Sequence, residues 1–263
     1  MRYLNIFAII FVFSTPFNTV SADALVLVHG FASNASSWHY SGINAVLTQQ
    51  GWQNAGLPGK TSNHPKKFFN IELPAQAPLI VQANYLKSFL TQLRLQYPQD
   101  KISIAGHSAG GVVARIALLE GNPANVSTLI TIASPHMGTP RASQALHTIN
   151  DTPFFCPGPF YDFVRSSLGG SDYDFLERSE GLLVDLLPAD YGGLLAWANQ
   201  QPHPVINYHA IIRQGGDALV PAFSQDLNQV PALRGKAKVW VSRSGHPLNP
   251  GDGLAILTIL GEN

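Results

Sequence analysis

The chain has 263 residues, of which 45% are hydrophobic and only 12% are charged, whereas about 25% of residues are charged in a typical soluble protein. Sixteen Lys and Arg residues balance sixteen Asp and Glu residues, which gives no basic surface for nucleic acid or for an anionic membrane. The length suits one large α/β domain and is short for two. The low charge favours apolar ligands or a lipid–water interface.

The first 22 residues have the pattern of a signal peptide. Arg2 supplies a positive charge, residues 4–13 are apolar, and Val20-Ser21-Ala22 fits the small-residue cleavage site. The apolar stretch is shorter than the roughly 20 residues that a membrane span needs, and an uncleaved anchor is the alternative interpretation. We therefore predict a signal peptide at residues 1–22 and a secreted or periplasmic mature chain at residues 23–263. Cys156 is the single cysteine, so no internal disulfide is expected.

Strand and helix patterns alternate along the mature chain. Short apolar runs predict buried strands, and apolar residues at helical spacing predict helices. The expected strands are residues 24–28, 68–73, 101–105, 126–133, 205–213 and 237–242, and the expected helices are residues 36–50, 78–97, 110–119 and 251–260. Residues 52–67 are expected to be loop. This alternation predicts an α/β fold with a mostly parallel, doubly wound sheet.

Residues 138–204 interrupt the alternation and are predicted to be a helical cap inserted over one edge of the sheet. They contain many aromatic residues, namely Phe154, Phe155, Phe160, Tyr161, Phe163, Tyr173, Phe175, Tyr191 and Trp197. Such side chains either line an acyl pocket or form the core of the cap itself. The apolar residues 182–187 are expected to be a cap helix or a lid.

Residues 106–110 read Gly-His-Ser-Ala-Gly and fit the Gly-X-Ser-X-Gly pattern. An apolar strand pattern precedes them and a helical pattern follows, as a nucleophile elbow requires. In such a tight turn, side chains two positions before or after the serine would clash, and Gly106 and Gly110 remove those clashes. Ser108 is therefore the expected nucleophile, although a glycine-rich turn without chemistry has the same pattern.

The sequence His29-Gly30-Phe31 directly follows the first predicted strand. A loop at this position can point a backbone N–H group to where an oxyanion would form. The expected donors are the backbone N–H groups of Phe31 and Ala109, each contributing roughly 3–4 kcal/mol to the transition state. His29 is expected to orient this loop without acid–base work.

A serine nucleophile needs a base, and the base needs an orienting acid. His246 lies in a small-residue loop after the last predicted strand, at the carboxyl edge of the sheet where α/β sites form. The order Ser, acid, His places the acid between Ser108 and His246. Asp217 follows the strand at residues 205–213 and is the expected acid. The rival carboxylates are Asp185, Asp190 and Asp226.

Five stretches resemble motifs of the bacterial lipase and esterase branch of the α/β-hydrolases. They are LVLVHGF, IAGHSAGGVVAR, LITIASPHMGTP, GGDALVP and SGHPLNP. The resemblance implies an α/β-hydrolase fold that hydrolyses carboxylic esters through an acyl-enzyme, without a cofactor. Many such relatives bind calcium through an aspartate shortly after the catalytic histidine. Here Asp252 is the first carboxylate after His246, so no metal site is carried over.

The leading interpretation is a secreted serine hydrolase, a lipase or esterase acting on small-molecule or lipid esters. An acyltransferase or a thioesterase would use the same three residues, and only its acceptor or leaving group would differ. A catalytically inactive secreted binding protein is a third interpretation, disfavoured because Ser108, Asp217 and His246 are all present. The sequence carries no signal for the oligomeric state.

Overall fold

The computed structural model describes residues 22–56, 62–119, 121–150 and 172–261. Residues 1–21 of the predicted signal peptide, Cys156 and five of the aromatic residues of the predicted cap (Phe154, Phe155, Phe160, Tyr161 and Phe163) lie outside these ranges. None of the helices within them is long and apolar enough to cross a membrane.

Seven parallel strands form one sheet in the order β2-β3-β1-β4-β5-β6-β7. Their bounds are β1 Asp23–Val28, β2 Gln53–Asn54, β3 Lys66–Ile71, β4 Lys101–His107, β5 Val126–Ile132, β6 Asn207–Arg213 and β7 Ala237–Ser242. The predicted α/β architecture is confirmed, with every strand pair parallel. The sequence reading missed the two-residue strand β2, which lies inside the predicted loop at residues 52–67.

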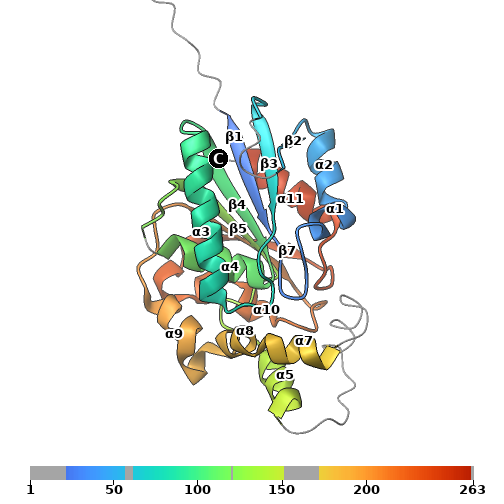
Figure 1. The fold of residues 1–263 in the computed structure, drawn as a ribbon, viewed down its shortest axis with the longest axis vertical. Helices are drawn as coiled ribbons and strands as arrows, with labels where there is room; N and C mark the ends of the chain where they lie inside the picture. Colours follow the sequence, from blue (N-terminus) through green and yellow to red (C-terminus); the bar gives the residue numbers. More distant parts are fainter. Residues whose placement is uncertain (1–21, 57–61, 120, 151–171, 262–263) are drawn as a thin grey trace, which may run out of the picture.

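Helices cover both faces of the sheet (Figure 1). One face packs against α3 (Leu79–Gln96) and α4 (Ala109–Leu119), and the other against α1 (Ser37–Tyr40), α2 (Ile43–Gln49) and α11 (Pro250–Gly261). Strand β1 shows the reason, because Val26 and Val28 enter the first core while Leu25 and Leu27 enter the second. A strand buried on both faces is apolar at every position, as the sequence indicated.

The helix predicted at residues 36–50 is wrong as one element, because the structure divides it into α1 and α2. Gly42 lies between them with φ = +82°, in the left-handed region. A residue in that conformation ends a right-handed helix, and glycine adopts it without a steric penalty. The break turns the chain so that both short helices bury side chains, Trp38 from α1 and Leu47 from α2.

The described part of the chain between β5 and β6 is mostly helical. It contains α5 (Pro140–Asn150), α7 (Asp172–Arg178), α8 (Glu180–Asp185), η1 (Ala189–Tyr191) and α9 (Gly193–Gln200). Three further short helices, α10 (Ala222–Gln225), η2 (Leu227–Gln229) and η3 (Pro231–Leu233), lie between β6 and β7 and were not predicted. Helices α5, α7, α8 and α9 gather below the carboxyl ends of β1 and β4 in Figure 1. They therefore cover the edge of the sheet where the predicted nucleophile lies.

Candidate active site

Ser108 lies in a sharp turn between β4, which ends at His107, and α4, which begins at Ala109. Its φ is +51°, a left-handed conformation that costs a non-glycine residue energy. The backbone N–H of Ser108 donates to the carbonyl oxygen of Ile132 at 2.8 Å, which ties the turn to the end of β5. The strand, the helix and this bond hold the serine in its strained position.

Glycines surround this turn because there is no room for side chains. A Cβ on Gly106 would lie 2.6 Å from the Cα of Gly111, and one on Gly110 would lie 2.2 Å from the carbonyl oxygen of His29. A Cβ on Gly30 would lie 2.9 Å from the Cβ of Ser108. The sequence predicted the clashes at Gly106 and Gly110, but the approach of Gly30 from the loop after β1 is visible only in the structure.

The structure brings Ser108, His246 and Asp217 together in one chain of hydrogen bonds. Nε2 of His246 is 3.0 Å from Oγ of Ser108, and Nδ1 of His246 is 2.7 Å from Oδ2 of Asp217. His246 is in the loop after β7 and Asp217 in the loop after β6, so 138 residues separate the serine from the histidine. The predicted nucleophile, base and acid are thus within the reach that proton transfer requires.

The carboxylate of Asp217 is held by four donors. The backbone N–H groups of Leu219 and Val220 donate to Oδ1, and Nε2 of Gln225 and Nδ1 of His246 donate to Oδ2. Burial by itself would raise the pKa of Asp217, but the hydrogen bond and charge of His246 and the two backbone donors outweigh it and lower the pKa. Asp217 is therefore ionised and faces the imidazole as an anion.

The three rival carboxylates lie elsewhere in the structure. Oδ2 of Asp185 accepts from the backbone N–H of Leu79 at the start of α3, and Oδ1 of Asp226 accepts from the backbone N–H of Asn228 at the start of η2. Asp190 lies in η1 and is exposed. None of the three contacts His246.

The backbone beside Ser108 is arranged by His29. The N–H of Leu73 donates to Nε2 of His29 at 3.0 Å, so the imidazole proton is on Nδ1, which donates to the carbonyl oxygen of Gly30 at 3.0 Å. In a trans peptide the N–H points opposite to the C=O, so this bond sets the direction of the Phe31 N–H. Ala109 is the first residue of α4, where N–H groups have no acceptor within the helix. Both predicted oxyanion donors thus lie on the backbone next to the nucleophile.

His107 makes a contact that the sequence did not reveal. Its Nε2 donates to the carbonyl oxygen of His246 at 2.9 Å. Burial, followed by the charge of His246, lowers the pKa of His107 to about 3, so its ring is neutral. The residue before the nucleophile therefore fixes the backbone of the loop that carries His246.

Asp252, the first carboxylate after the histidine, is paired with a buried cation. Both its oxygens accept from the guanidinium of Arg213 at 2.7 Å, and Oδ2 also accepts from the backbone N–H of Asn249. This pair joins β6 to α11 and anchors the chain that follows the histidine loop. Within the described ranges, no group of three or more His, Cys, Asp or Glu residues could hold a metal ion.

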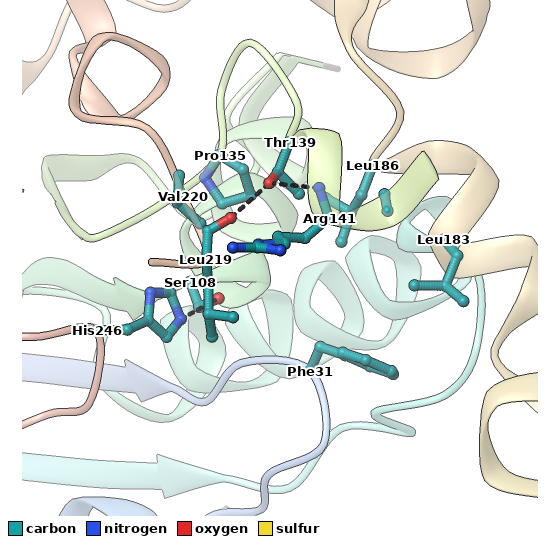
Figure 2. Close-up of a pocket in the computed structure, with 11 residues that line it drawn as sticks. Phe31, Ser108, Pro135, Thr139, Arg141, Leu183, Leu186, Leu219, Val220 and His246 are labelled. Carbon is teal, nitrogen blue, oxygen red and sulfur yellow. Dashed lines mark hydrogen bonds between the residues drawn. The ribbon is translucent and has the colours of Figure 1, made fainter. Parts of the chain in front are cut away.

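Ser108 opens into a pocket whose roof comes from the helices between β5 and β6 (Figure 2). Its lining is mostly apolar and consists of Phe31, Ser108, Pro135, Thr139, Arg141, Ala142, Leu183, Leu186, Leu219, Val220 and His246. None of the aromatic residues predicted to line an acyl pocket belongs to it where they are described. Phe175 packs on Phe31 at 5.2 Å between ring centroids, and Tyr191 and Trp197 are exposed.

Four histidines with lowered pKa values predict that stability falls in mild acid, and one of them is His29, whose pKa is lowered by burial. Burial lowers the pKa of His107 to about 3 and that of His203 to about 4, and it holds the pKa of His136 well below its usual range. They are neutral in the folded protein, while in the unfolded chain they bind protons below about pH 6.5. Their stabilisation is therefore complete above that pH and is lost below it, at about 1.4 kcal/mol per proton and pH unit.

Urea unfolding at about pH 7.5, 6.5 and 5.5 measures this effect as a drop in the free energy of unfolding below pH 6.5. His203→Gln should make the free energy of unfolding depend less steeply on pH, since it removes one of the groups that bind protons on unfolding. A free energy of unfolding that is constant from pH 7.5 to 5.5 would contradict the assignment.

The sheet, its flanking helices and the serine turn define the class of the protein, which has the α/β-hydrolase fold. It is similar in structure to a lipase-esterase related protein from Clostridium acetobutylicum, with a TM-score of 0.62, 12% identity, and 92% of this chain and 94% of that one covered. It is also similar to the mature lipase BlEst2 from Bacillus licheniformis, with a TM-score of 0.61, 14% identity, and 91% and 92% of the two chains covered. These likenesses concern the fold.

The chain belongs to the family of PGAP1-like alpha/beta domains, whose model matches residues 20–152 of the 263. It is 32% identical over 146 residues to GPI inositol-deacylase B from Yarrowia lipolytica, covering 46% of this chain and 15% of that protein. It is 31% identical over 130 residues to GPI inositol-deacylase from Candida albicans, covering 46% of this chain and 33% of that protein. The chain thus spans a third or less of the length of these two relatives.

Proposed function

We propose that this protein hydrolyses carboxylic esters with an acyl chain, through an acyl-enzyme formed on Ser108. The hydrogen-bonded chain of Ser108, His246 and Asp217 at the floor of an apolar pocket is the observation that carries the proposal. The relatives from Yarrowia lipolytica and Candida albicans are named GPI inositol-deacylases, and deacylation agrees with an acyl ester as substrate.

The geometry supports a two-step reaction. Nε2 of His246 takes the proton of Oγ as Ser108 attacks the ester carbonyl, and the backbone N–H groups of Phe31 and Ala109 hold the negative oxygen that forms. The same nitrogen then returns the proton to the leaving alcohol. A water molecule, deprotonated by His246, releases the acid and restores Ser108. Throughout, the anion of Asp217 stabilises the protonated imidazole.

The apolar roof predicts a preference for longer acyl chains. Leu183, Leu186 and Ala142 offer the chain a surface away from water, and each buried methylene contributes about 0.8 kcal/mol, close to fourfold in affinity. We expect kcat/KM for aryl esters to rise from acetate to at least octanoate. Ala142→Leu should shorten the optimal chain.

Ala145→Leu is the matched control, since Ala145 is equally buried on the same helix but does not line the pocket. Thermal unfolding of both variants checks that they fold. A maximum at acetate that Ala142→Leu leaves in place would show that this pocket does not hold the acyl chain.

We also propose that the protein is exported, with the mature chain beginning at Asp23. The arginine, apolar stretch and small residues at the amino terminus support this. Amino-terminal sequencing of the exported protein tests it, and an intact Met1 in the membrane fraction would favour an anchor.

A further inference from the structure

Arg141 is a charged residue in a pocket that is lined otherwise by Ser108, His246, Thr139 and apolar residues. It lies in the first turn of α5, and its backbone N–H donates to Oγ1 of Thr139 at 3.2 Å. Its side chain lines the same cavity as Ser108 and His246 (Figure 2). Because a guanidinium stays protonated at any physiological pH, the ester would meet a permanent positive charge here.

The guanidinium is held in place but is not neutralised. Nε donates to the carbonyl oxygen of Ala218 at 2.9 Å, and Nη1 donates to Oε1 of Gln144 at 2.6 Å. Across the described ranges, Arg141 forms no ion pair with a carboxylate, and Nη2 has no acceptor. A guanidinium has five N–H donors, so donors remain for a ligand while two bonds fix the orientation of the group.

The position of this charge separates two sides of the pocket. Figure 2 shows the guanidinium on the side of Leu219 and Val220, away from Leu183 and Phe31. A charged group of the substrate next to Leu183 and Phe31 would lose its hydration without gaining a partner. The acyl chain therefore suits the side of Leu183 and Phe31, and an anion suits the side of Arg141.

We propose that Arg141 determines specificity by binding an oxyanion, such as a phosphate, carried by the alcohol part of the ester. The proposal rests on the proposed ester hydrolysis and names its class of substrate, an acyl ester of an anionic alcohol. Charge-assisted bonds from a planar guanidinium, two of them in parallel where the geometry allows, suit an oxyanion. A neutral ester would leave the cation without this partner.

A purely structural role for Arg141 has a different signature. The Arg141 side chain bonds to Ala218, the residue directly after Asp217. Loss of this side chain could therefore disturb the loop that carries Asp217. Such a disturbance lowers the turnover of every ester by the same factor. Binding of an oxyanion instead changes the ratio between charged and neutral esters.

The test compares 1-hexanoylglycerol-3-phosphate with 1-hexanoylglycerol, which share one acyl chain. We expect wild-type kcat/KM to be at least about tenfold higher for the phosphate ester, and Arg141→Gln to lower this ratio roughly 10- to 100-fold, the contribution of one or two hydrogen bonds to a charged group. Arg141→Lys should keep part of the preference, and added salt should weaken it. Arg234→Gln, which removes an exposed charge outside the pocket, is the matched control and should retain the wild-type ratio.

Measuring how tightly the Ser108→Ala variant binds each ester tests the role of Arg141 separately from the proposed hydrolysis. Calorimetry should show tighter binding of the phosphate ester than of the neutral ester, and this difference should vanish in Ser108→Ala/Arg141→Gln. Should wild-type protein hydrolyse neither ester, the proposed function fails, while the binding difference still decides the role of Arg141.

Three results would overturn the role of Arg141. The first is a wild-type protein without preference for the phosphate ester, in turnover or in binding. The second is an equal loss for both esters in Arg141→Gln. The third concerns 1-adipoylglycerol, which carries its charge on the acyl chain. Its kcat/KM would exceed that of 1-hexanoylglycerol by a larger factor than the kcat/KM of the phosphate ester does.

Discussion

Ser108→Ala should remove ester hydrolysis almost completely while the protein still folds. Loss of a catalytic serine lowers kcat by about 10⁶-fold in an enzyme with the same three groups, and backbone donors retain roughly 10³–10⁴-fold over water. Alanine has the same Cβ as serine, so the strain at φ = +51° does not change. The substitution therefore removes the attacking oxygen and its bond to His246 and leaves the turn as it is.

Hydrolysis of a hexanoate ester, with thermal unfolding alongside, measures both parts of this expectation. A serine-directed phosphonate should label the wild-type protein once, at Ser108. Ser88→Ala is the matched control, because Ser88 is exposed on α3 and its hydroxyl bonds only within that helix. An active Ser108→Ala protein, or label on another serine, would refute the assignment of the nucleophile.

Asp217→Asn should lower kcat by about 10⁴-fold, as the equivalent change does in a serine protease. The carboxylate accepts the Nδ1 proton of His246, which keeps Nε2 free to accept the proton of Ser108. An asparagine can offer its amide N–H to Nδ1 instead, which moves the imidazole proton to Nε2 and blocks the base. The variant also has no anion to stabilise the imidazolium, so both steps of the reaction are slowed.

Asp185→Asn and Asp226→Asn are the controls, because these side chains hold the starts of α3 and η2 and not the imidazole. Their activity should stay within a few-fold of wild type once folding is checked. Asp217→Asn combined with Ser108→Ala should add little to Ser108→Ala alone, since the three groups act as a unit. A severe loss in either control with an active Asp217→Asn would reassign the acid.

The sequence by itself determined those features that depend on neighbouring residues. Unbroken apolar runs identified the strands because a strand buried on both faces has no polar side. Gly106 and Gly110 identified the turn at Ser108 because both clashes arise within a few residues of the serine or at the strand next to it. The loops that carry Asp217 and His246 were predictable because carboxyl ends of parallel strands meet at one edge of the sheet.

Only the tertiary structure decided what depends on contacts between distant segments. The partners of Asp217 and of its rival Asp185 are visible only in the structure, and the bond from His107 to His246 joins residues 139 positions apart. Leu183 of α8 and Leu186 just after it line the pocket because this segment packs over Ser108, and the Arg141 side chain is held at the pocket by its bond to Ala218, 77 residues away. The spacing of apolar residues indicates which face of a helix or strand is buried, but it does not indicate which other element covers that face.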